Sequence, residues 1–219
     1  MELSFMRFVR HSEGSSGTPA APGSDTPDQL ERTGSSPVRP VSRAPIGPCT
    51  LERMFPIATS VHLRTVTFAH PHAIEMNDRV QLEYAERYGD EGDVTFLDPS
   101  MFEPPRGRYL IAYDGSGTPL ATGGWRAMDE NDMGYADGDA ELKRMYVTPQ
   151  ARGLGLARRI LAALEDDAKA AGRARMVLET GTKQPEAIAL YTSSGYTLAP
   201  VKFGHYRFEN LSRCYVKAL

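Results

Sequence analysis

The chain of 219 residues has two cysteines, one tryptophan and no long apolar run. Cys49 and Cys214 are far apart and form no CxxC pair, so neither a disulfide framework nor a zinc site is indicated. No apolar stretch is long enough to span a bilayer, and residues 1–10 are too polar for the core of a signal peptide. We therefore expect a cytoplasmic protein without a membrane partner.

An excess of basic charge is also missing. The chain has 25 Lys and Arg against 28 Asp and Glu, which gives a formal net charge of −3. Proteins that bind nucleic acids usually carry a basic patch that contacts phosphates, so we expect no nucleic acid partner. The histidines at positions 62, 70, 72 and 205 have no spacing typical of metal ligands, and we expect no metal.

The N-terminal quarter differs in composition from the rest. Residues 11–50 are rich in Pro, Ser and Gly and contain almost no large apolar side chains. Such a segment buries too little surface to offset its ordering entropy, so we expect disorder over residues 1–55 and one folded domain over 56–219. A second interpretation stays open, in which Met54 is the native start and the preceding residues are a mis-assigned extension.

Hydrophobic periodicity and turn signals predict alternating strands and helices in the folded domain. The expected strands are 61–66, 109–113, 119–125, 140–147, 175–180, 196–198 and 213–217, and the expected helices are 73–85, 156–168 and 185–194. Residues 90–107 are expected to form a loop. Gly123-Gly124 indicates a β-bulge, and the alternative is a close approach of the strand backbone to a ligand. This order predicts an α/β layer with mixed strand directions.

The most informative stretch is residues 141–157, which predicts a strand, a turn and the start of a helix. The turn lacks the Lys-Ser/Thr pair of a P-loop, and Arg158 stands where a Rossmann turn needs a small residue. Free N–H groups at a helix N-terminus bind phosphate, and Gly153 and Gly155 allow a close approach of the backbone. Arg152 adds a positive charge. The alternative is a tight turn without a ligand.

Two motifs carry a resemblance to a known family. The pattern Gln150-x-x-Gly153-x-Gly155 after a strand resembles the pyrophosphate loop of the GNAT superfamily of N-acetyltransferases, which use acetyl-coenzyme A. Residues 184–196, with Leu-Tyr followed by Gly-Tyr, resemble the late helix of the same family. The resemblance covers about residues 60–217. It implies the GNAT-like fold, a mixed and mostly antiparallel central sheet flanked by helices.

The resemblance also implies a set of contacts with acetyl-CoA. Met145 and Val147 would pair with the pantetheine arm through their backbone, with Tyr146 between them. Gln184 stands where the family often has an asparagine that contacts the cofactor. The pyrophosphate would lie against the loop that begins at Gln150, on the backbone N–H groups of Arg152, Gly153, Leu154, Gly155, Leu156 and Ala157.

The implied reaction is direct transfer of the acetyl group to an amine. A base must take a proton from the ammonium, and an acid must supply one to the departing thiolate. By resemblance, Tyr191 is the acid, and the alternative for Tyr191 is a core aromatic. Glu141 stands where some members of the family keep a catalytic carboxylate, and Glu179 is the second candidate for the base. The alternative for Glu141 is a solvated charge at a strand end.

Three functions remain open from the sequence. The first is an N-acetyltransferase that acts on a primary amine of a small molecule. The second is acetylation of a protein N-terminus or lysine, which predicts a wide open groove. The third is a coenzyme A-binding module without catalysis. Dimers are common among the proteins that the chain resembles, so a homodimer is one expectation for the oligomeric state.

Overall fold

The computed structural model describes residues 60–89 and 92–219. The predictions of disorder over residues 1–55 and of a start at Met54 lie outside these residues, as does Cys49. Among the described helices, none combines the length and the apolar composition needed to cross a membrane.

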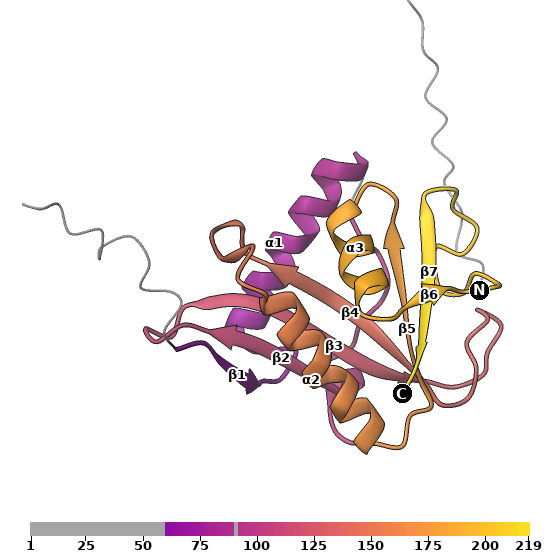
Figure 1. The fold of residues 1–219 in the computed structure, drawn as a ribbon, viewed down its shortest axis with the longest axis horizontal. Coiled ribbons are helices and arrows are strands. Elements are labelled where there is room, and N and C mark those ends of the chain that lie inside the picture. Colours follow the sequence, from indigo (N-terminus) through magenta and orange to yellow (C-terminus); the bar gives the residue numbers. More distant parts are fainter. Residues whose placement is uncertain (1–59, 90–91) are drawn as a thin grey trace, which may run out of the picture. The chain divides into compact units, whose positions relative to one another are not determined.

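The described residues form one seven-stranded sheet with the order β1-β2-β3-β4-β5-β7-β6 (Figure 1). All neighbours are antiparallel except β4 and β5. The mixed, mostly antiparallel sheet that was predicted is therefore confirmed. The strands are β1 (His62–Thr65), β2 (Gly107–Tyr113), β3 (Pro119–Met128), β4 (Asp139–Val147), β5 (Arg175–Gly181), β6 (Thr197–Leu198) and β7 (Ser212–Ala218).

Three α-helices cover the two faces of this sheet: α1 (Pro71–Tyr88), α2 (Leu156–Ala170) and α3 (Pro185–Ser193). Successive side chains of β2 point to opposite faces of the sheet and show which helices cover each face. Leu110 and Ala112 pack in one cluster with residues of α2 and α3, whereas Tyr109 and Ile111 pack in another with Ala73 of α1. Helices α2 and α3 therefore lie on one face and α1 lies on the other.

Helix α2 forms because its apolar residues repeat at helical spacing. Leu156, Ile160, Leu161, Leu164 and Ala168 are all buried. Complete burial of one Leu or Ile side chain contributes about 1.5–3 kcal/mol, so this stripe holds the helix against β2, β3 and β4. The loop of residues 152–155, which leads into α2, is thereby fixed to the sheet.

The ends of α1 follow from local chemistry. Pro71 occupies the first turn, and His70 caps the helix because its Nδ1 accepts the N–H of His72 at 3.1 Å. Gly89 ends it with a left-handed φ of 74°, as the sequence predicted. The helix is longer than predicted, and the expected loop 90–107 contains a short 3-10 helix, Pro99–Phe102, capped by Asp98.

The parallel pair β4 and β5 is joined for only three residue pairs, from Asp139↔Arg175 to Glu141↔Val177. Beyond these pairs the two strands diverge, so within residues 60–89 and 92–219 no strand pairs with the edge of β4 that faces β5 from Leu142 to Val147. An unpaired strand edge in the middle of a sheet exposes backbone donors and acceptors. This opening positions the site.

Candidate active site

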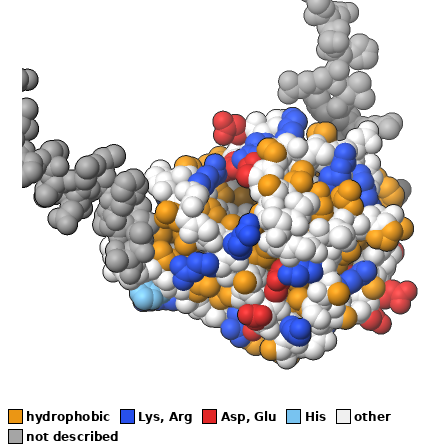
Figure 2. All heavy atoms as spheres, in the orientation of Figure 1, with side chains coloured by type: hydrophobic (Ala, Val, Ile, Leu, Met, Phe, Trp, Pro, Cys, Tyr) orange, Lys and Arg blue, Asp and Glu red, His pale blue; other side chains and the backbone are white. Residues whose placement is uncertain are grey.

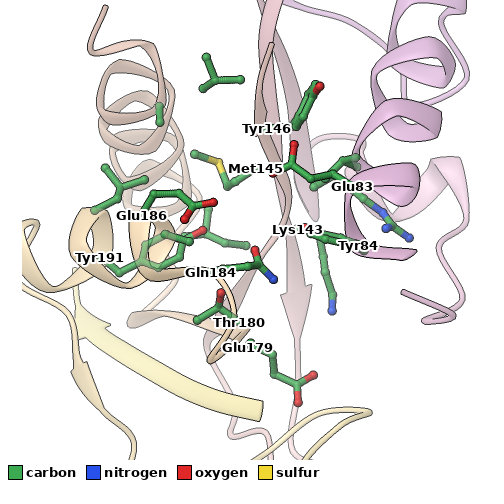
Figure 3. Close-up of a pocket in the computed structure, with 18 of the residues that line it drawn as sticks. Glu83, Tyr84, Lys143, Met145, Tyr146, Glu179, Thr180, Gln184, Glu186 and Tyr191 are labelled. Carbon is green, nitrogen blue, oxygen red and sulfur yellow. The ribbon is translucent and has the colours of Figure 1, made fainter. Parts of the chain in front are cut away.

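A cavity of about 1100 Å³ lies where β4 and β5 diverge. Its lining comes from α1, β4, β5, α3 and the loop before α2, together with residues 92–93 and 206–212 (Figure 3). On the face drawn in Figure 2, the surface is hollowed between α1 and α3, and both acidic and basic side chains lie at the rim. The cavity therefore joins the two faces of the sheet through its opening.

A β-bulge shapes the wall that β4 contributes. The register shifts between Thr122 and Gly124, so that Arg144 and Met145 both stand opposite Gly123. Arg144 has a φ of 56°, which is uncommon for a residue other than glycine. The bulge places Lys143 and Arg144 on the same face, since one contacts Glu141 and the other contacts Gln81 of α1. The bulge predicted at Gly123-Gly124 is confirmed.

The loop before α2 presents a row of free donors. Within residues 60–89 and 92–219, no hydrogen bond accepts from the backbone N–H groups of residues 153–158, and the first helical bond runs from Arg159 to Gly155 at 3.1 Å. Gly153 and Gly155 have left-handed φ values of 81° and 73°. A Cβ at either position would meet no protein atom within 4 Å. The glycines are therefore needed for backbone conformation and leave the space in front of the N–H groups open.

The arginines near this loop have different roles. Arg152 pairs with Glu83 of α1 at 2.6 Å across the cavity wall, and Arg158 donates to Ser193 of α3 at 2.9 Å. Both line the cavity. Arg159 donates to the carbonyl of Val61 at 3.0 Å and is not part of the lining. Two cations are thus available next to the free N–H groups.

Tyr191 reaches the cavity from α3 (Figure 3). Its side chain is buried, and its ring packs edge-on against Tyr196 with centroids 5.6 Å apart. Burial raises the pKa of Tyr191 well above its usual range, so the hydroxyl remains protonated near neutral pH. Tyr84 of α1 also lines the cavity, and its pKa is raised by burial and then by the proximity of Tyr191.

Glu179 of β5 lines the cavity on the face of α1. Its Oε1 accepts from the backbone N–H of Tyr206 at 3.1 Å and from the Ser212 hydroxyl at 3.5 Å, while its Oε2 is buried without a partner. Burial raises its pKa to about 7, although the charge of Lys143 opposes the shift. Gly204 packs against the carboxylate, where a Cβ would collide with Oε2.

Glu141 lies outside the cavity lining. It is completely buried, and both of its oxygens have partners. Oε1 accepts from Tyr135 at 2.7 Å and faces Lys143 at 3.1 Å, while Oε2 accepts from Arg126 at 2.7 Å. Burial raises the pKa of Glu141, but the charges of Lys143 and Arg126 outweigh it and lower the pKa overall. A carboxylate in this setting holds its neighbours in place, and the solvated strand end considered from the sequence is not what the structure has.

The remaining predicted residues divide into two groups. Gln150 and Leu154 are exposed and do not line the cavity. Gln184 lines it and donates to the Tyr88 hydroxyl at 3.3 Å. The other predicted cofactor contacts that line the cavity are Met145, Tyr146, Val147, Arg152, Gly153, Gly155, Leu156 and Ala157.

Several cavity residues were not found from the sequence. Val80, Tyr84 and Tyr88 line one face of α1 at intervals of four residues, so a continued helical stripe was the available signal. Lys143 stands on a central strand that also carries other charges, which is unusual enough to indicate a site. No local sequence pattern indicates Tyr206, because its loop comes to lie at the cavity only when distant parts of the chain pack together.

In the part of the chain that the structure describes, no three His, Cys, Asp or Glu side chains are grouped as metal ligands. Cys214 is buried, and burial raises the pKa of its thiol.

A sheet opened between two parallel strands, with a donor-rich loop at the start of the following helix, defines an acyltransferase of the acyl-CoA N-acyltransferase fold. The chain belongs to the acetyltransferase (GNAT) family, whose profile matches residues 73–196. The fold, the family resemblance and the acyltransferase activity expected from the sequence are therefore confirmed.

Individual relatives agree with this assignment. An "IAA acetyltransferase" of Azospirillum brasilense is 40% identical over 100 residues, which cover 46% of this chain and 61% of that relative. An uncharacterised N-acetyltransferase of Schizosaccharomyces pombe is 31% identical and is covered over 70% of its length, against 52% of this chain. The solved structure of an acyl-CoA N-acyltransferase from Klebsiella pneumoniae is 28% identical with a TM-score of 0.59, covering 73% of this chain and 97% of that one.

Proposed function

We propose that this protein transfers an acetyl group from acetyl-CoA to a primary amine of a small molecule, with Glu179 as general base and Tyr191 as general acid. The observation that carries the proposal is the placement of these two groups. They line one cavity from opposite faces of the sheet, beside the row of free N–H groups. Glu179 thus replaces Glu141 as the preferred base.

The residues present fit acetyl-CoA. The N–H groups of residues 153–158 and the side chains of Arg152 and Arg158 would hold the pyrophosphate. The unpaired edge of β4 from Met145 to Val147 would pair with the pantetheine amides. When bound, acetyl-CoA supplies the acetyl thioester.

Side chains of the protein accept and donate the protons of the reaction. A carboxylate with a pKa of about 7 takes a proton from the acceptor ammonium, directly or through one water molecule. As the amine nitrogen bonds to the acetyl carbon, the carbon–sulfur bond breaks and Tyr191 gives its proton to the thiolate. The raised pKa of Tyr191 keeps that proton in place until sulfur becomes basic.

Two hydrogen bonds on the acceptor side support a small molecule over a protein substrate. The Tyr206 hydroxyl accepts from the N–H of Val94 at 2.8 Å and donates to Asp93 at 3.2 Å. These bonds tie the loop after α1 to the loop before β7 across the cavity. A protein N-terminus or a lysine on a folded surface would need an open groove there.

The proposal is tested by the pH dependence of kcat/KM. For wild type we expect activity to rise as the pH passes about 7, where Glu179 loses its proton. Glu179→Gln should lower kcat/KM by about 100-fold or more at pH 8 and remove this rise. Glu209→Gln is the control, since Glu209 lines the cavity but is exposed. An unchanged profile in Glu179→Gln would remove Glu179 from the mechanism.

A further inference from the structure

The acceptor side of the cavity contains an unusual set of buried charges. Regular alternation along β4 places Lys143 on the same face as Glu141, and the bulge turns the next residue, Arg144, toward α1 on that face as well. Lys143 and Glu179 come from neighbouring strands and extend toward the same end of the cavity (Figure 3). The groups that make up this acceptor cluster are Asp93, Arg126, Glu141, Lys143, Arg144 and Glu179.

The pairings within the acceptor cluster leave Lys143 with capacity for a ligand. Glu141 is already held by Arg126 at 2.7 Å and by Tyr135, so it does not depend on Lys143 alone. Arg144 is directed to Asp93, with its Nη1 3.5 Å from the carboxylate. Lys143 forms an ion pair with Glu141 at 3.1 Å, and an ammonium has three N–H donors. In the described residues, no ion pair joins it to Glu179.

The charge balance decides which acceptor fits. With all six groups ionised, three cations face three carboxylates and the cluster is neutral. A simple ammonium would add one uncompensated charge to a buried site, which is costly. An acceptor that carries its own carboxylate adds none. After Glu179 takes the proton of the ammonium, the protein cluster is left with one positive charge, and that carboxylate offsets it.

We propose that the acceptor is an amino acid or another small molecule whose amine lies beside a carboxylate, and that Lys143 binds this carboxylate while Glu179 faces the amine. The inference rests on the proposed N-acetyltransferase function and names its substrate class. The acetylation itself is unchanged: the nitrogen loses a proton to Glu179 and gains the acetyl group.

The test uses purified full-length protein with acetyl-CoA and matched acceptors. Free amino acids are compared with their amides and with the corresponding amines that lack the carboxylate, by release of the coenzyme A thiol. We expect the free amino acid to exceed its amide in kcat/KM by at least about tenfold, the effect of one charge-assisted hydrogen bond. Amides or simple amines that react equally well or better would overturn the substrate class and leave the proposed function standing. No turnover with any acceptor would overturn both.

Lys143→Met then tests the residue. With the amino acid, KM should rise by at least about tenfold with little change in kcat, because a charge-assisted contact in the ground state and the transition state is lost. The ratio of kcat/KM for the amino acid to kcat/KM for its amide should fall by at least about tenfold, since any effect of the lost charge on Glu179 acts on both substrates, and Lys143→Arg should restore part of this ratio. If Lys143 had a purely structural role, Lys143→Met would lower kcat/KM for both substrates by the same factor, and this result would overturn the assignment. The wild-type comparison decides the substrate class even where Lys143→Met fails to fold.

Discussion

Tyr191 can be tested as a single hydroxyl group. Tyr191→Phe removes the proton donor and keeps the buried ring, so kcat should fall by about 100-fold or more while the Kd for acetyl-CoA stays nearly unchanged. Tyr196→Phe is the matched control. Tyr196 contacts the Tyr191 ring, but its hydroxyl donates to Glu165 at 2.9 Å, and it does not line the cavity. Equal kcat values for the two variants would exclude Tyr191 as the acid.

Glu179 also affects stability, because its pKa is raised from 4.5 to about 7 in the folded protein. A raised pKa stabilises the folded state below the unfolded value, and this contribution is lost as the pH rises through about 7. The loss is at most about 3 kcal/mol between pH 4.5 and 7, from the size of the shift. The free energy of unfolding of wild type, measured in urea, should therefore fall across this range relative to Glu179→Gln. A constant difference between the two proteins would contradict the raised pKa.

At the scale of the element, the loop before α2 depends on left-handed glycines. In Gly155→Ala, the new Cβ strains a backbone with a φ of 73° by about 1–2 kcal/mol, and the relaxation of this strain should displace the N–H groups that would hold the pyrophosphate. We expect at least about tenfold weaker binding of acetyl-CoA by calorimetry.

Gly172→Ala is the control for this prediction. Gly172 follows the other end of α2, has a φ of 78°, and would also place its Cβ in open space. Both variants should lose similar stability, but Gly172→Ala should bind acetyl-CoA normally. The same affinity in both variants would show that the loop is only a turn.

The elements themselves could be predicted from sequence where the signal is local. The apolar stripe of α2 and the cap at Gly89 depend on residues close together in the chain, and both appear as expected. The loop before α2 could be predicted for the same reason, since its glycines and the following helix are contiguous, and its role toward the cofactor stays a prediction.

The acceptor side of the site depends on pairings that are distant in sequence. The orientation of Arg144 toward α1 follows from the bulge, where Arg144 and Met145 both stand opposite Gly123 of β3. Glu141 was expected at a strand end in solvent because its burial beside Tyr135 and Arg126 arises only when β3 and β4 pair. Tyr206 reaches Asp93 over a separation of 113 residues. No local pattern contains this information.

At the scale of the whole molecule, the sheet separates the residues that we propose for acetyl-CoA from those that we propose for the acceptor. The donor-rich loop and α3 lie on the face of α2, while Lys143 and Glu179 lie on the face of α1. The cavity lies where β4 and β5 diverge, and residues from both faces line it. Acetyl-CoA and the amine would therefore meet at the opening from opposite sides.

The most direct measurement is the release of coenzyme A thiol by the purified protein at pH 8, with and without small amines, together with mass spectrometry of the acceptor. We predict release that requires an amine and a product that carries one added acetyl group on nitrogen. Binding of acetyl-CoA without turnover on any small amine, or turnover only with protein N-termini or lysines, would contradict the account.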